Sequence, residues 1–109
     1  MGTMQAVVSV TINNVTRDFF YRPDSVGDKG VIAQIFQQQD YNLARFPLHG
    51  KLLRYYHQQA ANGLVNLIVD AGANIGAGTV YLHGHFPQAA ILAIEPERGN
   101  VELLRKNCA

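Results

Sequence analysis

A glycine-rich turn preceded by an acidic residue is the most informative stretch of the sequence. Residues 69–78 read VDAGANIGAG, directly after an apolar run. Gly72 lets the chain turn sharply and lets a ligand approach the backbone closely. Asn74 tolerates a left-handed backbone, and Gly76 falls where a side chain of the next helix would obstruct the same approach. Open α/β sheets bind their ligands at such turns, beyond the carboxyl ends of their strands.

A second acidic residue follows the next apolar run. Glu95 lies 25 residues after Asp70 and precedes Pro96, which stiffens the turn that presents it. A carboxylate at this position can accept hydrogen bonds from both hydroxyls of a ribose. Together, the two turns predict a site for a nucleoside.

The glycine spacing and the charge distinguish two classes of nucleoside ligand. A dinucleotide fingerprint reads G-x-G-x-x-G and places a pyrophosphate on a helix N-terminus. Here the glycines are Gly72, Gly76 and Gly78, and Asp70 would repel a pyrophosphate but favour a cation. S-adenosylmethionine carries an ammonium and a sulfonium and no phosphate, and the methyltransferase pattern D/E-x-G-x-G-x-G aligns with Asp70, Gly72, Asn74 and Gly76. The sequence therefore favours methyl transfer, provided that Asp70 does not point into the hydrophobic interior, over a dinucleotide-binding oxidoreductase.

The second half of the chain alternates predicted strands and helices. The apolar run at 64–69 is typical of a strand covered on both faces. Residues 75–83 are expected to form a helix that Phe86-Pro87 ends, 90–94 a second buried strand, and 100–107 another helix. This β-α-β-α order predicts an α/β fold with a partial Rossmann-like sheet.

The first half is expected to hold a β-hairpin and two helices. Strands at 6–12 and 15–21 flank Asn13-Asn14, and Ser25 with Asp28 resembles a capping box before a helix at 28–38. A second helix is predicted at 48–61, ended by Asn62-Gly63. Its apolar face would carry Leu48, Leu52, Leu53 and Tyr56. We therefore divide the chain into an N-terminal part, 1–63, and the first half of a cofactor-binding domain, 64–109.

Composition excludes several other classes of protein. The 109 residues carry a net charge of +1 and no long basic run, so no nucleic-acid partner is expected. No apolar run could cross a membrane, and the single cysteine, Cys108, fits the cytoplasm. His83 and His85 lie at a predicted helix end without a nearby acid or thiol, so no metal site is expected.

The motifs together resemble the FkbM family of S-adenosylmethionine-dependent methyltransferases. The resemblance covers roughly residues 15–107 and rests on residues 69–76, Val80-Tyr81, residues 94–97 and 100–107, preceded by Arg22-Pro23, Asp28 and Asp40-Tyr41. It implies a Rossmann-like fold and transfer of a methyl group to a hydroxyl of a sugar or other small molecule. It further implies that the cofactor is bound by Asp70, Ala71, Gly72, Asn74, Gly76 and Glu95, with Glu95 on the ribose. The later strands of the family pattern have no counterpart here, so no catalytic base is assigned.

Two parallel strands cannot cover both faces and both edges of a sheet. We therefore expect a truncated cofactor-binding unit, or one that completes its sheet with another chain. The second alternative is a non-catalytic module that forms a homo-oligomer through its unpaired sheet edge.

Overall fold

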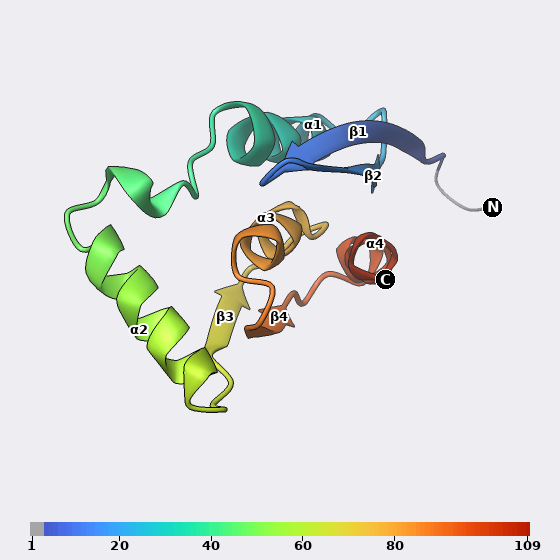
Figure 1. Cartoon of the computed structure of the whole chain (residues 1–109). Helices are drawn as coiled ribbons and strands as arrows, with labels where there is room; N and C mark the ends of the chain where they lie inside the picture. The colour runs from blue at the N-terminus through green and yellow to red at the C-terminus, as the bar shows by residue number, and fades with distance from the viewer. Residues whose placement is uncertain (1–3) are drawn as a thin grey trace.

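The computed structural model describes residues 4–109 (Figure 1). Its elements, in chain order, are β1 (Ala6–Ile12), β2 (Val15–Tyr21), α1 (Val26–Ile32), the π-helical turn η1 (Ala33–Gln37), the 3-10 turn η2 (Leu43–Arg45), α2 (His49–Ala61), β3 (Leu67–Ala71), α3 (Ala77–His85), β4 (Ala90–Ile94) and α4 (Arg98–Cys108).

The N-terminal hairpin has the predicted strands and turn. β1 and β2 pair antiparallel in a register that runs from Ala6 opposite Tyr21 to Ile12 opposite Val15. Asn13 and Asn14 have φ angles of 49° and 67°, so both central residues of the two-residue turn are left-handed. This geometry matches the right-handed twist of a hairpin, and asparagine adopts it more readily than most residues.

The second half forms the predicted β-α-β-α unit, with shifted boundaries. β3 and β4 pair in parallel, from Leu67 opposite Ala90 to Ala71 opposite Ile94. The first strand begins at Leu67 rather than residue 64, because β4 offers no partner for the chain before Asn66, whose carbonyl accepts from the amide of Ala90. The first helix begins at Ala77 rather than residue 75, since the positive φ of Gly76, 101°, keeps the turn non-helical up to that point.

The main core lies between the hairpin and the two C-terminal helices. In Figure 1, α3 and α4 lie between the hairpin and the β3–β4 sheet, and α1 lies against the hairpin. Apolar side chains from all these helices and from both hairpin strands form one buried cluster: Val10, Ile12, Phe19, Ile32, Ile35, Ile75, Ala77, Val80, Tyr81 and Leu103. The hairpin therefore stabilises the helices that flank the glycine turn.

Helix α1 begins at Val26, two residues earlier than predicted, and its hydrogen-bond pattern changes to π-helical at Ala33. Half of the predicted capping box is present, since Ser25 Oγ accepts from the backbone N–H of Asp28 at 3.0 Å. The other half is wrong. The carboxylate of Asp28 turns to Arg22 instead, because a charged donor outcompetes a backbone amide.

Helix α2 lies to one side of the molecule (Figure 1), and Tyr56 is its buried residue. The Tyr56 ring packs edge-on against Phe86 at 5.0 Å, and its hydroxyl accepts from the amide of Gln88 at 2.9 Å. The predicted apolar face of this helix is only partly buried, because Leu48 and Leu52 are exposed. Asn62-Gly63 ends the helix as predicted, with Gly63 at a φ of 76°.

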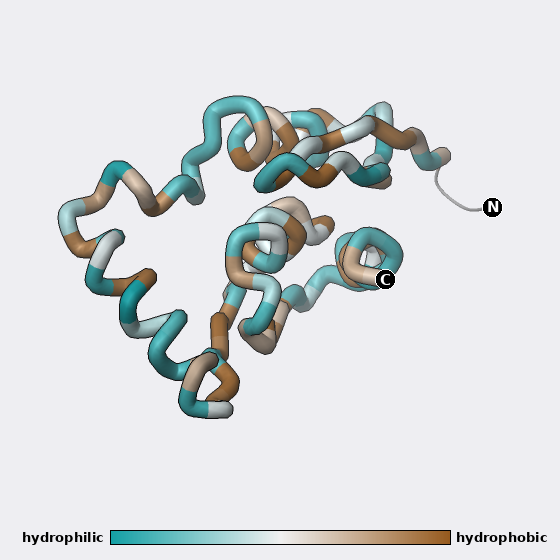
Figure 2. The backbone as a smooth tube through the Cα atoms, in the orientation of Figure 1, coloured by the Kyte–Doolittle hydropathy of each residue, from teal (hydrophilic) through white to brown (hydrophobic). Residues whose placement is uncertain are grey.

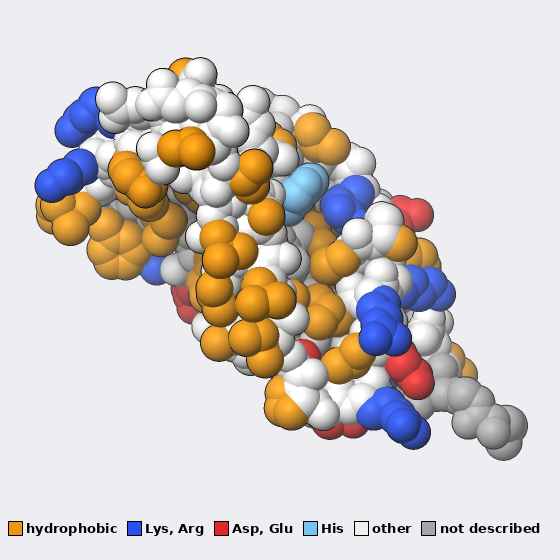
Figure 3. All heavy atoms as spheres, turned by 90° about the horizontal axis from the view of Figure 1, so that it is seen from below, with side chains coloured by type: hydrophobic (Ala, Val, Ile, Leu, Met, Phe, Trp, Pro, Cys, Tyr) orange, Lys and Arg blue, Asp and Glu red, His pale blue; other side chains and the backbone are white. Residues whose placement is uncertain are grey.

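One face of the β3–β4 sheet is exposed, which corrects the expectation of strands covered on both faces. Figure 2 shows the apolar character of β3, and Figure 3 shows hydrophobic side chains gathered on the face seen from below. Leu67, Val69, Leu92 and Ile94 are each about half exposed or more. Helices α3 and α4 lie on the opposite face of the sheet. Among residues 4–109, no helix covers the exposed face.

Candidate functional site

The glycine turn is fixed to the end of β4 by backbone hydrogen bonds. The amides of Gly72 and Ala73 both donate to the carbonyl of Ile94, at 2.8 and 2.9 Å. Gly72 and Asn74 have φ angles of 75° and 56°. Residues with positive φ thus form the turn, and two of its amides donate to β4. These two hydrogen bonds hold the carboxyl ends of β3 and β4 together.

Gly72 and Gly76 are glycines for different reasons. A Cβ on Gly72 would meet no atom within 4 Å, so the surface beside it is open to a ligand. A Cβ on Gly76 would lie 3.0 Å from Leu104 Cδ1 and 3.6 Å from Asn107 Cβ, both on α4. Gly76 therefore allows α4 to pack against the turn, and its role beside a ligand stays a prediction.

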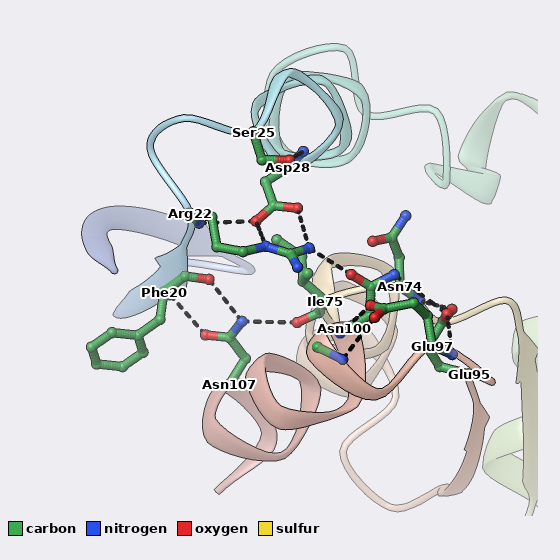
Figure 4. A network of polar contacts seen from close by, with 11 residues as sticks. Phe20, Arg22, Ser25, Asp28, Asn74, Ile75, Glu95, Glu97, Asn100 and Asn107 are labelled. Atoms are coloured by element: carbon green, nitrogen blue, oxygen red, sulfur yellow. Dashed lines mark hydrogen bonds and ion pairs between the residues drawn. The ribbon is translucent and has the colours of Figure 1, made fainter. Parts of the chain in front are cut away.

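Glu95 connects the two turns. Its Oε1 accepts from the backbone N–H of Asn74 at 2.9 Å, and its Oε2 accepts from the backbone N–H of Glu97 at 3.2 Å and the side-chain amide of Asn100 at 3.3 Å (Figure 4). The hydrogen bond from Asn74 is the main cause that lowers the pKa of the Glu95 carboxyl below 4.5, with smaller contributions from Glu97 and Asn100. Glu95 is thus an ionised, partly exposed acceptor at the predicted position.

Asp70 does not share this surface. Its side chain is only 6% exposed, and its Oδ2 accepts from the hydroxyl of Thr79 on α3 at 2.6 Å. The expectation of an open carboxylate at the mouth of the turn is therefore wrong: the side chain lies between β3 and the first turns of α3. Ala71, the next residue of β3, is exposed. A role for Asp70 in binding the cofactor stays a prediction.

A groove of about 350 Å³ runs beside Glu95, between β4 and α4. Ile91 and Ala93 of β4 form its floor, Val101 and Leu104 of α4 form a wall, and Glu95 lies among its lining residues. An apolar surface next to a hydrogen-bonding carboxylate suits a ligand that has one flat apolar part and neighbouring hydroxyls.

A charged network supports Glu95 from behind (Figure 4). Asp28 accepts three hydrogen bonds from Arg22: from the backbone N–H, from Nε and from the terminal nitrogen Nη2. Nη2 also donates to the side-chain oxygen of Asn100 at 2.5 Å, and Asn100 donates to Glu95. Sequence reasoning had treated Asp28 as a helix cap and had given Arg22 and Asn100 no individual role.

Asn107 is a second polar residue that sequence reasoning missed. It is fully buried, and its side chain exchanges hydrogen bonds with both backbone groups of Phe20, at 2.7 and 3.0 Å. The same amide donates to the carbonyl of Ile75 at 2.8 Å. Asn107 therefore joins β2, α4 and the glycine turn, and the spacing along the chain gave no signal of these contacts.

The remaining candidates lie outside this site. Gly78 is packed against another part of the chain, since a Cβ there would lie 2.6 Å from the ring of Tyr41. His85 packs on the ring of Tyr81, and burial lowers its pKa below 6.5. Within residues 4–109, no three His, Cys, Asp or Glu side chains are placed to hold a metal ion together. In the same range, no helix has the length and apolar character needed to cross a membrane.

Comparison with known proteins gives two similarities, both to fungal methyltransferases. Methyltransferase sdnD of Sordaria araneosa is 30% identical over 90 residues, which is 83% of this chain and 29% of that protein. Methyltransferase 1 of Beauveria bassiana (strain ARSEF 2860) is 43% identical over 42 residues, 38% of this chain and 17% of that protein. These two matches support a methyltransferase family.

The chain thus spans less than a third of either curated relative. No family model matches the chain. No solved structure matches it either.

Proposed function

We propose that this chain binds S-adenosylmethionine at the carboxyl ends of β3 and β4, and that it supplies this site to a methyltransferase. The observation that carries the proposal is the position of Glu95, an ionised acceptor held between the two turns with its outer side accessible. A ribose hydroxyl can donate to the lone pair of Oε1 that these contacts leave free. The similarity to fungal methyltransferases supports the same assignment.

The cofactor would lie over the open turn at Gly72, beside Ala71 and Asn74. No side chain blocks the backbone there, since a Cβ on Gly72 would meet open space. Asp70 offers the cofactor no open carboxylate, because its side chain is buried and already bonded to Thr79. The apolar groove beside Glu95 would be available to the adenine ring.

Burial of the helix start argues against a dinucleotide. A pyrophosphate needs exposed N–H groups at a helix N-terminus. In this chain the start of α3 is covered: Gly76 packs under Leu104, and Ala77 is fully buried. A phosphate-free nucleoside makes no such demand, so the geometry favours S-adenosylmethionine over a nicotinamide dinucleotide.

Methyl transfer asks little covalent chemistry of the protein. The sulfonium already activates the methyl group, and the protein has to align it with the acceptor. We infer, from the FkbM resemblance, that the acceptor is a hydroxyl of a sugar or other small molecule. We further propose that the methyltransferase is of the FkbM type, methylates oxygen and acts in the cytoplasm.

Calorimetric titration with S-adenosylhomocysteine tests the proposal. Glu95→Gln keeps the side-chain shape but replaces one acceptor oxygen with a donor, so affinity should fall about tenfold or more. Glu102→Gln is the matched control, because Glu102 is exposed on α4 and should leave affinity unchanged. Equal affinity of Glu95→Gln and the unsubstituted chain, or tighter binding of a nicotinamide dinucleotide, would contradict the proposal.

A further inference from the structure

The carboxylate of Glu95 is held by contacts that reach back to the N-terminal part of the chain. Three donors fix it: the amides of Asn74 and Glu97, which belong to the backbone, and the side chain of Asn100. Only the last of these depends on a rotatable side chain.

The orientation of the Asn100 amide is set by Arg22. Nη2 of Arg22 donates to the oxygen of Asn100, so the NH2 group of Asn100 must face the other way, towards Glu95. Arg22 is itself fixed, because Asp28 accepts from its Nε and Nη2 at 2.9 and 2.8 Å. Asp28 is only 2% exposed, which leaves this pair little freedom to move.

In each hydrogen bond between Asp28 and Glu95, the donor and the acceptor are therefore fixed. Asp28 can only accept and Arg22 can only donate, which leaves Asn100 one productive orientation (Figure 4). With Oε2 held by Asn100 and Glu97, and Oε1 by Asn74, the plane of the Glu95 carboxylate is fixed. Three of the roughly four lone-pair sites of the carboxylate are then occupied, so one, on Oε1, is left for a ligand.

We propose that Asn100, oriented by Arg22, is a positioning residue that aims the free lone pair of Glu95 Oε1 at a ribose hydroxyl. This proposal rests on the proposed function. It predicts that Asn100 contributes to recognition of that hydroxyl and not to binding of the rest of the nucleoside. The Arg22–Asp28 pair would then link the N-terminal hairpin and α1 to cofactor recognition.

The test compares two ligands, S-adenosylhomocysteine and its 2′,3′-dideoxy analogue, by calorimetry. The unsubstituted chain should prefer the ribose ligand about tenfold or more, and Asn100→Ala should reduce this preference by about threefold to tenfold. Affinity for the dideoxy analogue should stay the same. A merely structural role would weaken both ligands equally, and that result would overturn the proposal.

Further variants keep the test independent of folding defects. Asn100→Asp still accepts from Arg22 but cannot donate to Glu95, and it adds a like charge, so it should lose at least as much preference as Asn100→Ala. Arg22→Lys keeps the charge but loses the fork that orients Asn100, so part of the preference should be lost. Glu102→Gln, on the exposed face of the same helix, should retain all of it. Circular dichroism establishes that each variant is folded.

Carboxyl NMR provides a readout that does not need a ligand. Because Asn100 helps to lower the pKa of Glu95, Asn100→Ala should raise that pKa towards 4.5. If the unsubstituted chain binds neither ligand, the proposed function fails and this inference fails with it. If it binds S-adenosylhomocysteine and Glu95→Gln abolishes the preference while Asn100→Ala leaves both preference and pKa unchanged, only the positioning role is overturned.

Discussion

Removal of the Asp28 carboxylate should destabilise the chain more than any surface substitution. In Asp28→Ala, Arg22 loses three hydrogen bonds, at 2.9, 2.9 and 2.8 Å, and one of the orphaned donors is a backbone N–H. Breaking a buried ion pair by removing one partner typically costs 3–5 kcal/mol. The Arg22 side chain is 22% exposed and keeps its bond to Asn100, so water can partly replace the lost acceptors. We therefore expect the lower end, about 3 kcal/mol.

Urea denaturation followed by circular dichroism measures this loss. With an m value of roughly 1–1.5 kcal/mol/M for a chain of this size, the midpoint should fall by about 2–3 M. Asp24→Ala, four residues away in the exposed turn before α1, is the matched control and should change stability by less than about 0.5 kcal/mol. A loss below about 1 kcal/mol for Asp28→Ala would refute the reasoning, because the pair would then be as weak as a surface salt bridge.

The same pair predicts a pH dependence whose sign is fixed. Burial alone would raise the pKa of Asp28, but the hydrogen bonds and charge of Arg22 and the bond from Ser25 lower it below 3.8. A carboxyl whose pKa is lower in the folded state stabilises the fold above its unfolded pKa and loses that contribution as the pH falls through the folded pKa. The difference in unfolding free energy between the unsubstituted chain and Asp28→Ala should be full at pH 6 and should shrink below pH 3.8.

Three further substitutions test the packing around the site. Asn107→Ala leaves buried backbone groups of β2 and the glycine turn without partners, so it should cost about 3 kcal/mol in urea denaturation. Gly76→Ala forces a Cβ to within 3.0 Å of Leu104 at a φ of 101°, whereas Gly72→Ala meets no atom; the first should lower the melting temperature clearly more than the second. We also expect the chain to self-associate through the edge and exposed face of the β3–β4 sheet. Leu92→Glu should lower the mass measured by light scattering to that of a monomer. A monomeric unsubstituted chain would contradict this expectation.

Elements with a strong local signal were predicted well. Asn13-Asn14 specifies the hairpin turn because both residues adopt positive φ, and β4 was predicted with its observed bounds, Ala90–Ile94. Where the signal depends on partners far along the chain, prediction was less accurate. Residues 64–69 are apolar except for Asn66, and apolar residues lie on both sides of it, so only the pairing of Asn66 with Ala90 fixes where β3 begins.

Polar residues that join distant segments could not be identified from spacing. Asn107 bonds to Phe20 across 87 residues, and Arg22 bonds to Asn100 across 78. In the sequence, Asn100 and Asn107 both look like ordinary polar positions of an amphipathic helix. The residue type alone does not show whether an asparagine is half-buried or fully buried. Burial, which decides their role, is a property of the packed hairpin and not of α4 alone.

The buried position of Asp70 removes the charge argument for methyl transfer, so the ligand argument depends on other atoms of the same two turns. Sequence reasoning relied on a carboxylate open to a cation, whereas the side chain is buried and bonded to Thr79. Two observations replace that contact: Glu95 offers an accessible, oriented acceptor, and the covered start of α3 leaves no exposed helix end for a pyrophosphate. The first favours a ribose, and the second disfavours phosphates. The hairpin matters to this outcome because it packs on α3 and α4 and, through Arg22 and Asn107, fixes the turns that would hold the cofactor.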